Sequence, residues 1–373
     1  MIKLASPDIS ESDILRVADV IKSGSLIQGV NVVEFETLLS NFTGIPFSAV
    51  LSSGTAALHL SLIALGIGAN DSVIVPAFTF PATANVVEII GAEVILADVD
   101  PTSYVITPKL LEETILKNRD KNIKAVIVVH EFGYPAEMKA ISEIVRKYGL
   151  YLIEDAACAL GTIADNYHVG YYSDMACFSF HPRKAITTGE GGAVITTKTE
   201  LADKIKILRN HGISYQNYGM DFIYAGFNYR MTDFQAALAI GQLERFKEEL
   251  LKRKFLASKY YEILKEEKKV RLPENNDGHS WQSFMIVLDK SIDRKKIIEE
   301  LLEKGIQTNL GAQAIHCLSY YKQKYNYSHA DFSNASQLFN NGLVLPLYGK
   351  LVEEEVIHIS KSLKKALDKI ILS

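Results

Sequence analysis

The chain has 373 residues, 48% hydrophobic and 23% charged, and its formal net charge of −4 gives no basic surface for nucleic acid. No apolar run reaches the length of a membrane span, residues 1–8 lack the apolar core of a signal peptide, and the three cysteines form no C-x-x-C pair. We therefore expect a cytoplasmic protein with a large core, two domains and reduced thiols, and we expect no metal site.

The N-terminal segment predicts two helices joined by a short connector. Apolar residues recur at helical spacing over residues 10–23, and Gly24 follows where a helix commonly ends. A second helix is expected through Val33, Phe35 and Leu38. Composition alone favours an ordinary surface connector at residues 24–29.

The next stretch has the features of an anion site. Residues 49–51 predict a short strand, and the run S-S-G-T at residues 52–55 leads directly into a helix. Free backbone N–H groups and the helix dipole favour an anion at such a helix start. Gly54 permits close approach there and Thr55 adds a hydroxyl group. A plain serine or threonine N-cap is the alternative.

Strands and helices then alternate along the chain. Short apolar runs predict strands at 73–76, 93–97, 125–129, 150–153, 175–180 and 193–197, and helices are expected at 108–116, 138–148 and 201–208. This alternation is typical of a mostly parallel sheet that is covered on both faces. Phe80 follows the first of these strands, and on the residues alone a core phenylalanine is the alternative to a functional aromatic residue there.

Two charged residues sit beside predicted buried strands. Asp155 follows the strand at 150–153, where a carboxylate needs a cationic partner unless it simply caps the next helix. Lys184 lies between the strands at 175–180 and 193–197, among small, hydroxylated and glycine residues. Burial disfavours the charged form of a lysine, so we expect Lys184 to have a lowered pKa and a nucleophilic amine. A lysine that extends from a loop into solvent is the alternative.

The second half of the chain predicts a smaller α+β domain. A long helix is expected over residues 234–251, with Thr232 or Asp233 as its N-cap. Composition then shifts to lysine and glutamate, and strands are expected at 281–288 and near 306–308, with helices at 294–304 and 353–367. We therefore predict a large domain over residues 1–250 and a small domain over residues 251–373.

Several blocks together resemble a known family. The run from Ser179 to Gly192, the S-G-T turn, the E-D-A-A block at 154–157 and the G-F-N-Y-R-M block at 226–231 are similar to motifs of the DegT/DnrJ/EryC1/StrS-type sugar aminotransferases. The resemblance implies a pyridoxal 5'-phosphate (PLP) enzyme of transferase fold type I. Such a fold is α/β, with a large domain built on a mixed, mostly parallel sheet and a smaller C-terminal α+β domain. It also implies a homodimer with shared active sites.

The resemblance assigns roles to the residues of the expected cofactor site. Lys184 would form the Schiff base with the cofactor, and Asp155 would keep the pyridine nitrogen protonated, which makes the ring an electron sink. The remaining cofactor contacts would come from Gly54, Thr55, Phe80, Cys158 and Ser179. Phe80 would stack on the ring, and Ser179 would bind the phosphate with Gly54 and Thr55. The position of Cys158 often holds Gln or His in the family, whereas a thiol is a weak hydrogen-bond donor.

Other residues of the resembled motifs would act across the dimer or on the substrate. Asn228 would reach the phosphate bound by the partner, and Gln28 would line the partner's site. Tyr229 and His316 are further candidates for substrate contact. Residues 311–316 depart from the H-Y-x-P run common in relatives, so the resemblance says least about this wall of the pocket.

The resemblance implies transfer of an amino group from L-glutamate to a nucleotide-linked keto-sugar. The segments 7–9 and 26–29 look more like the members that act at C4, which indicates a 4-keto-6-deoxy sugar. An aminotransferase acting on a small phosphorylated ketone and a non-catalytic PLP-binding regulator are the alternatives. A dehydratase of the same fold would carry histidine at the position of Lys184, so Lys184 argues against it.

Overall fold

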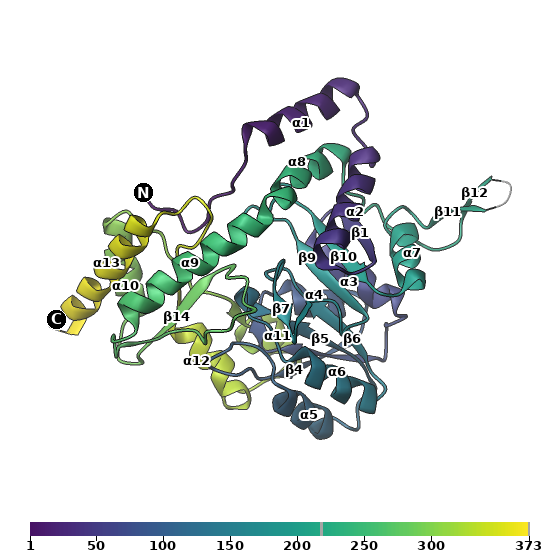
Figure 1. Ribbon diagram of the computed structural model, residues 1–373. Helices are drawn as coiled ribbons and strands as arrows, with labels where there is room; N and C mark the ends of the chain where they lie inside the picture. The colour runs from purple at the N-terminus through teal and green to yellow at the C-terminus, as the bar shows by residue number, and fades with distance from the viewer. Residues whose placement is uncertain (217–218, 372–373) are drawn as a thin grey trace.

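The computed structural model describes residues 1–216 and 219–371. Within these residues a seven-stranded sheet, in the order β1-β10-β9-β6-β5-β2-β4, forms the centre of the larger part of the molecule (Figure 1). Its strands are β1 (Phe47–Leu51), β2 (Ser72–Pro76), β4 (Glu93–Ala97), β5 (Ile123–Val129), β6 (Tyr151–Asp155), β9 (Met175–Ser179) and β10 (Gly192–Thr196). β10 pairs antiparallel with β1 and β9, and the other neighbouring strands are parallel. The predicted mostly parallel sheet is therefore confirmed.

Every residue of β2 and β10 is buried, so both faces of this sheet are covered, as helices cover them in such folds. The helices of this part are α1 (Glu11–Ser23), α2 (Val30–Thr43), α3 (Gly54–Ala64), α4 (Ala82–Ile89), α5 (Pro108–Lys117), α6 (Met138–Lys147), α7 (Thr199–Leu208) and α8 (Asp233–Glu244). α3 packs against β9 and β10 and beside α4 and α7, while α5 packs beside α6. Among the described residues, no helix combines the length and the apolar character needed to cross a membrane.

The smaller part is built on the antiparallel sheet β13 (Val270–Arg271), β14 (Phe284–Leu288) and β16 (Gly342–Leu345). Helices α9 (Phe246–Leu264), α10 (Arg294–Glu303) and α13 (Glu353–Ile371) belong to it, and its own apolar cluster runs from Leu256 to Leu367. Helix α11 (Ser319–Tyr325) and helix α12 (Ser333–Asn341) instead pack on the core of the larger part through residues such as Leu338. A division at residue 250 stays a prediction.

The predicted long helix at 234–251 is wrong, because the chain breaks between α8 and α9 at Arg245. Arg245 leaves the helical conformation, with φ −96° and ψ 4°. Its guanidinium donates to the Asp13 carboxylate (Nη1–Oδ1, 3.0 Å) and to the backbone oxygen of Asp8 (2.7 Å). These contacts tie the N-terminal segment to the junction of the two helices, and the apolar periodicity of the sequence does not reveal them.

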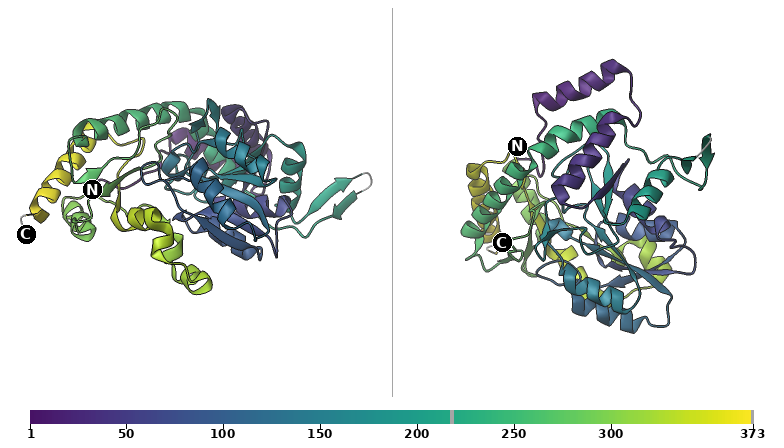
Figure 2. Two further views of the ribbon diagram at one scale, coloured as in Figure 1. Left: turned by 90° about the horizontal axis from the view of Figure 1, so that it is seen from below. Right: turned by 45° about the vertical axis from the view of Figure 1, so that its right-hand side comes forward.

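Two predicted strands also differ from the structure. β14 begins only at Phe284, because Trp281 has a positive φ of 55° that a strand does not accommodate. No strand is assigned at residues 306–308 of the described chain, where Ile306 makes a single bridge with Ile2. The hairpin of β11 (Ile213–Gln216) and β12 (Gly219–Phe222) was not predicted from the sequence, and it projects from the body of the molecule (Figure 2).

Short strand pairs complete the fold near the sheet. β3 (Phe78–Thr79) pairs with β15 (Gln313–Ala314), and β7 (Ile163–Ala164) pairs with β8 (Tyr167–His168). The first of these pairs joins a segment that follows β2 to residues 311–316, the stretch that departs from the family pattern.

Candidate active site

A cavity of about 390 Å³ lies at the ends of the central strands, beside the smaller part. Gln282, Asn309 and Leu345 are among the residues that the C-terminal half contributes to its wall. The predicted site residues that line the cavity are Gly54, Thr55, Phe80, Asp155, Cys158, Ser179 and Lys184. The structure thus brings the expected lysine, carboxylate and anion turn into one space.

The loop that carries Lys184 is held from two sides. It connects β9 to β10, whose first paired residues are Ser179 and Gly192. Gln242 of α8 accepts from the backbone N–H of Thr187 (3.0 Å) and donates to its carbonyl oxygen (2.8 Å). Gln282 of the smaller part donates to the carbonyl oxygen of Arg183 (2.6 Å). These bonds fix the backbone on either side of Lys184, so that its side chain enters the cavity.

The amine of Lys184 donates to the Cys158 sulfur, with Nζ and Sγ 3.0 Å apart. Burial by itself lowers the pKa of Lys184, but Cys158, Asp155 and Glu131 together outweigh it and leave this pKa raised. The expected lowered pKa is therefore wrong for the protein chain alone, where Lys184 is an ammonium group. Burial also raises the pKa of the Cys158 thiol. Cys158 thus accepts from the lysine instead of acting as a strong donor.

Asp155 is the last residue of β6, and its buried carboxylate is held by two donors. Thr83 Oγ1 donates to Oδ2 at 2.7 Å, and the backbone N–H of Ala157 donates to Oδ1 at 3.1 Å. Burial raises the pKa of Asp155, while these two hydrogen bonds and the charge of Lys184 lower it. Such a carboxylate can accept a further hydrogen bond from a cationic group in the cavity.

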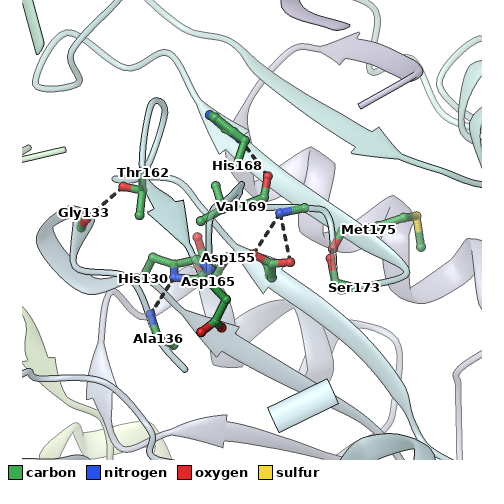
Figure 3. Close-up of polar contacts among 12 residues, drawn as sticks. His130, Gly133, Ala136, Asp155, Thr162, Asp165, His168, Val169, Ser173 and Met175 are labelled. Carbon is green, nitrogen blue, oxygen red and sulfur yellow. Dashed lines mark hydrogen bonds and ion pairs between the residues drawn. The ribbon is translucent and has the colours of Figure 1, made fainter. Parts of the chain in front are cut away.

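Glu154, the residue before Asp155, holds the ends of β5 and β6 together. Glu154 pairs with His130, with Nε2 and Oε2 2.7 Å apart, and both side chains are buried. Ala136 donates its backbone N–H to His130 Nδ1 (3.1 Å), so the ring proton lies on Nε2 (Figure 3). The backbone N–H of Gly170 also donates to both carboxylate oxygens of Glu154, each at 3.0 Å. This pair ties the end of β5 to the end of β6 and keeps Asp155 in place.

The S-G-T turn lines the cavity at the N-terminus of the 11-residue helix α3. Ser53 caps the helix by accepting from the Ala56 N–H at 3.0 Å. A Cβ atom on Gly54 would lie 2.8 Å from the Cβ of Ser179, so glycine lets the turn approach β9 closely. The backbone N–H groups at this end, with the hydroxyls of Thr55 and Ser179, suit a phosphate group.

We predict that Gly54→Ala weakens binding of PLP to the cofactor-free protein by about tenfold or more, because the added methyl group must displace Ser179. Titration of the cofactor followed by absorbance measures this affinity. Gly68→Ala is the matched control, since a Cβ atom there would meet nothing within 4 Å. Equal affinities for both variants would contradict a phosphate seat at Gly54.

Taken together, these residues fit the cofactor that the sequence resemblance implies. An amine, a buried carboxylate and an anion-binding helix start lie in one cavity, and Phe80 exposes 62% of its surface beside them. PLP carries an aldehyde, a ring nitrogen and a phosphate, for which the amine, the carboxylate and the helix start are respectively suitable partners.

Four predicted site residues lie outside the cavity of their own chain. Gln28 is in the connector between α1 and α2, and Asn228 is exposed, with a backbone bridge to Asn210. The Tyr229 hydroxyl lies 3.2 Å from Nδ1 of His59 in α3. Substrate contact for His316 stays a prediction; the residue is only 2% exposed. Its Nε2 pairs with the Ser336 hydroxyl of α12 at 2.8 Å and not with the cavity.

Glu131 lines the cavity and was missed by the sequence analysis. Burial raises its pKa to about 8, and the charge of Asp155 adds to this shift while Lys184 opposes it. The signal in the sequence is its position two residues after β5, the strand that pairs with β6. Carboxylates after neighbouring parallel strands meet at one sheet edge, so Glu131 and Asp155 were predictable neighbours.

The raised pKa of Glu131 predicts how the stability of the cofactor-free protein depends on pH. Between the ordinary value of 4.5 and about 8, the folded state keeps a proton that the unfolded state has lost. The contribution of Glu131 to the free energy of unfolding therefore falls as pH rises through this range. Denaturant titrations at several pH values should show that Glu131→Gln removes this fall. An unchanged pH dependence would show that Glu131 ionises normally.

Comparison with known proteins agrees with this geometry. The model of the DegT/DnrJ/EryC1/StrS aminotransferase family matches residues 7–364. The chain is 32% identical to the spore coat polysaccharide biosynthesis protein SpsC of Bacillus subtilis, over 96% of this chain and 95% of that protein.

Solved structures of similar proteins cover almost the whole chain. PseC of Helicobacter pylori, an aminotransferase involved in the biosynthesis of pseudoaminic acid, has a TM-score of 0.93 at 28% identity, over 99% of each chain. Spr1654 of Streptococcus pneumoniae, solved in a PLP-form, has a TM-score of 0.92 at 28% identity, over 99% of each chain. Its PMP-form has a TM-score of 0.92 at 27% identity, over 99% of this chain and 100% of that one. The chain therefore belongs to the DegT/DnrJ/EryC1/StrS aminotransferase family and is a PLP-dependent aminotransferase of fold type I.

Proposed function

We propose that this enzyme transfers the amino group of L-glutamate to C4 of a nucleotide-linked 4-keto-6-deoxy sugar in the cytoplasm. The observation that carries the proposal is the meeting of Lys184, Asp155 and the Gly54 turn in one cavity. The names of SpsC and PseC support a sugar acceptor, since they refer to polysaccharide and pseudoaminic acid biosynthesis. The segments 7–9 and 26–29 support the choice of C4.

Lys184 and Asp155 carry the chemistry in this proposal. When bound, PLP supplies an electron sink and carries the amino group between the two substrates. Lys184 holds the cofactor at rest and then moves a proton to and from the α-carbon of the amino donor, as general base and acid. Asp155 keeps the ring nitrogen protonated with the lone pairs that Thr83 and Ala157 leave free.

The remaining cavity residues bind and orient the cofactor. Gly54, Thr55 and Ser179 would hold the phosphate, and the exposed ring of Phe80 would stack on the cofactor. Cys158 lies at the amine of Lys184, where its sulfur accepts a hydrogen bond before the cofactor is attached.

A homodimer with shared sites is part of the proposal. Ile27 and Val30, beside Gln28, expose 75% and 80% of their surface, and Tyr215 of the projecting hairpin exposes 76%. Large apolar side chains that are exposed next to each other favour a protein contact. The backbone N–H of Asp233 donates to the carbonyl oxygen of Leu26 (3.2 Å), which joins the Gln28 connector to the segment after Asn228. We infer that Gln28, Asn228 and Tyr229 serve the cavity of the partner subunit.

The first test is the absorption of the bound cofactor. L-glutamate should bleach the band of the lysine-bound cofactor and release 2-oxoglutarate, and a nucleotide-linked 4-keto-6-deoxy sugar should restore the band. A non-catalytic PLP-binding regulator would keep its band unchanged in glutamate. Restoration by a small phosphorylated ketone, and by no keto-sugar, would overturn the proposed acceptor.

Mixing two inactive variants tests the shared sites. Lys184→Ala and Asn228→Ala homodimers should each be impaired, the second through weaker phosphate binding at limiting PLP. A mixed dimer would hold one site with both defects and one with neither. With random subunit exchange, about a quarter of the parent activity should return. If exchange is demonstrated by mass spectrometry and no activity returns, Asn228 serves its own chain and the proposal of shared sites fails.

A further inference from the structure

Two histidines and a cysteine lie together outside the cavity. His316 and Cys317 belong to the short helical turn η2 (Ile315–Cys317), and His329 begins the next such turn, η3 (His329–Phe332). One ligand atom of each of the three side chains lies within 4.8 Å of the other two. None of the three residues lines the cavity. The cluster is therefore separate from the proposed cofactor site.

The distances within the cluster suit a tetrahedral metal ion. Cys317 Sγ and His329 Nδ1 lie 3.5 Å apart. Zinc bonds of about 2.3 Å to sulfur and about 2.0 Å to nitrogen, at the tetrahedral angle, place two such atoms roughly 3.5 Å apart. The rings of His316 and His329 meet edge to face, with their centroids 5.6 Å apart. The His329 side chain is exposed, so it can rotate to close the remaining gap to His316.

A hydrogen bond between the Cys317 thiol and His329 would explain that one distance, but it leaves His316 unexplained. His316 is only 2% exposed, and its Nε2 lies 2.8 Å from the Ser336 hydroxyl. Its Nδ1 is also buried and has no hydrogen-bond partner among the described residues. Buried polar atoms are rarely left unpaired, and such an atom calls for a further partner, for example an ion.

The imidazole of His316 has a lone pair to give. A neutral ring carries one N–H group and one lone pair, and the Ser336 hydroxyl can serve only one of them. With Nε2–H donating to Ser336, the lone pair of Nδ1 stays free. A histidine that binds a metal commonly has its other N–H held by a neighbouring acceptor in this way. Ser336 Oγ also lies 3.5 Å from His329 Nδ1, so this hydroxyl lies between the two rings.

We propose that His316, Cys317 and His329 bind one Zn²⁺ ion, with a fourth position open to water. Two imidazole nitrogens and a thiolate are ligands that Zn²⁺ prefers, whereas Mg²⁺ and Ca²⁺ prefer oxygen. Binding converts the Cys317 thiol to a thiolate and releases its proton to solvent. A metal-bound His316 is not free for the substrate, so bound zinc would exclude the predicted substrate contact of this residue.

The ion would join two segments that flank α11. Cys317 precedes this helix and His329 follows it, 12 residues later. Gly311 and Ala312, shortly before η2, line the cavity. Bound zinc should therefore stabilise the segment that forms this wall. The expectation of no metal site rested on the spacing of the cysteines, which does not reveal histidines that the fold brings beside one of them.

Zinc titration of the chelator-treated enzyme, with PLP bound, tests the site. Competition with a chromophoric chelator should show one tightly bound zinc ion per chain. Cys317→Ala and His329→Gln should each weaken this binding by at least about tenfold, because each removes a ligand. His358→Gln is the matched control, since His358 is an exposed histidine of α13 outside the cluster. A parent enzyme that binds no zinc, or variants that bind it as tightly as the parent, would overturn the proposal.

Cobalt(II) in place of zinc identifies the ligands by absorption. The parent should show the visible bands of a tetrahedral site and a near-ultraviolet band from the thiolate, both measured against the metal-free enzyme. Cys317→Ala should lose the thiolate band, and its persistence would place the ion elsewhere and overturn the proposal. Zinc should also raise the melting temperature of the parent but not of His329→Gln. None of these measurements depends on amino transfer, so the proposed function can fail while this inference stands.

Discussion

Lys184→Ala should lower the rate of amino transfer by about 10³-fold or more, because the variant has no group to move the proton. It should also lose the absorption band of the lysine-bound cofactor while remaining folded and binding PLP without a covalent bond. Borohydride reduction followed by peptide mapping measures the attachment. Lys109→Ala is the control, because the Lys109 side chain is 84% exposed and lies outside the cavity. Cofactor still attached to the alanine variant after reduction would remove Lys184 as the Schiff-base residue.

Asp155→Asn should keep the attached cofactor and slow both halves of the reaction by orders of magnitude. The neutral amide no longer stabilises the proton on the ring nitrogen, and losing a hydrogen bond between charged groups alone costs about 1.5–3 kcal/mol. Single-turnover rates with L-glutamate and with the keto-sugar measure the two halves separately. Asp277→Asn is the control, because the Asp277 carboxylate is fully exposed. An Asp155→Asn enzyme with rates near those of the parent would exclude Asp155 from the mechanism.

The central sheet could be predicted because its strands are short apolar runs that alternate with helices. The same apolar runs placed Asp155 and Lys184 beside β6 and β9. Their charge pointed to a functional role, since a charged residue after a buried strand needs a partner. The break at Arg245 could not be seen, because the apolar period continues across it and its cause is the distant Asp13.

Some properties of the site depend on contacts that no local pattern shows. The raised pKa of Lys184 results from Cys158, Asp155 and Glu131, which three separate segments bring together. The pairing of His316 with Ser336 of α12 could not be seen either, because 20 residues separate the two side chains in the chain. Residue type and spacing identified the chemistry of the cavity better than they identified its walls.

The position of Glu131 shows what sequence analysis can still add. A second carboxylate after a neighbouring parallel strand was visible in the run V-V-H-E. The raised pKa of Glu131 was not visible, because it results from burial and from the charge of Asp155, which the fold brings about.

Transfer of labelled nitrogen is the most direct test of the proposed reaction. The enzyme loaded with PLP is incubated with L-glutamate carrying heavy nitrogen and with a nucleotide-linked 4-keto-6-deoxy sugar, and the products are analysed by mass spectrometry. The account predicts a nucleotide-linked 4-amino sugar that contains the heavy nitrogen, together with 2-oxoglutarate, and no such product from Lys184→Ala. Formation of 2-oxoglutarate without label in any nucleotide-linked sugar, across a panel of such keto-sugars, would contradict it.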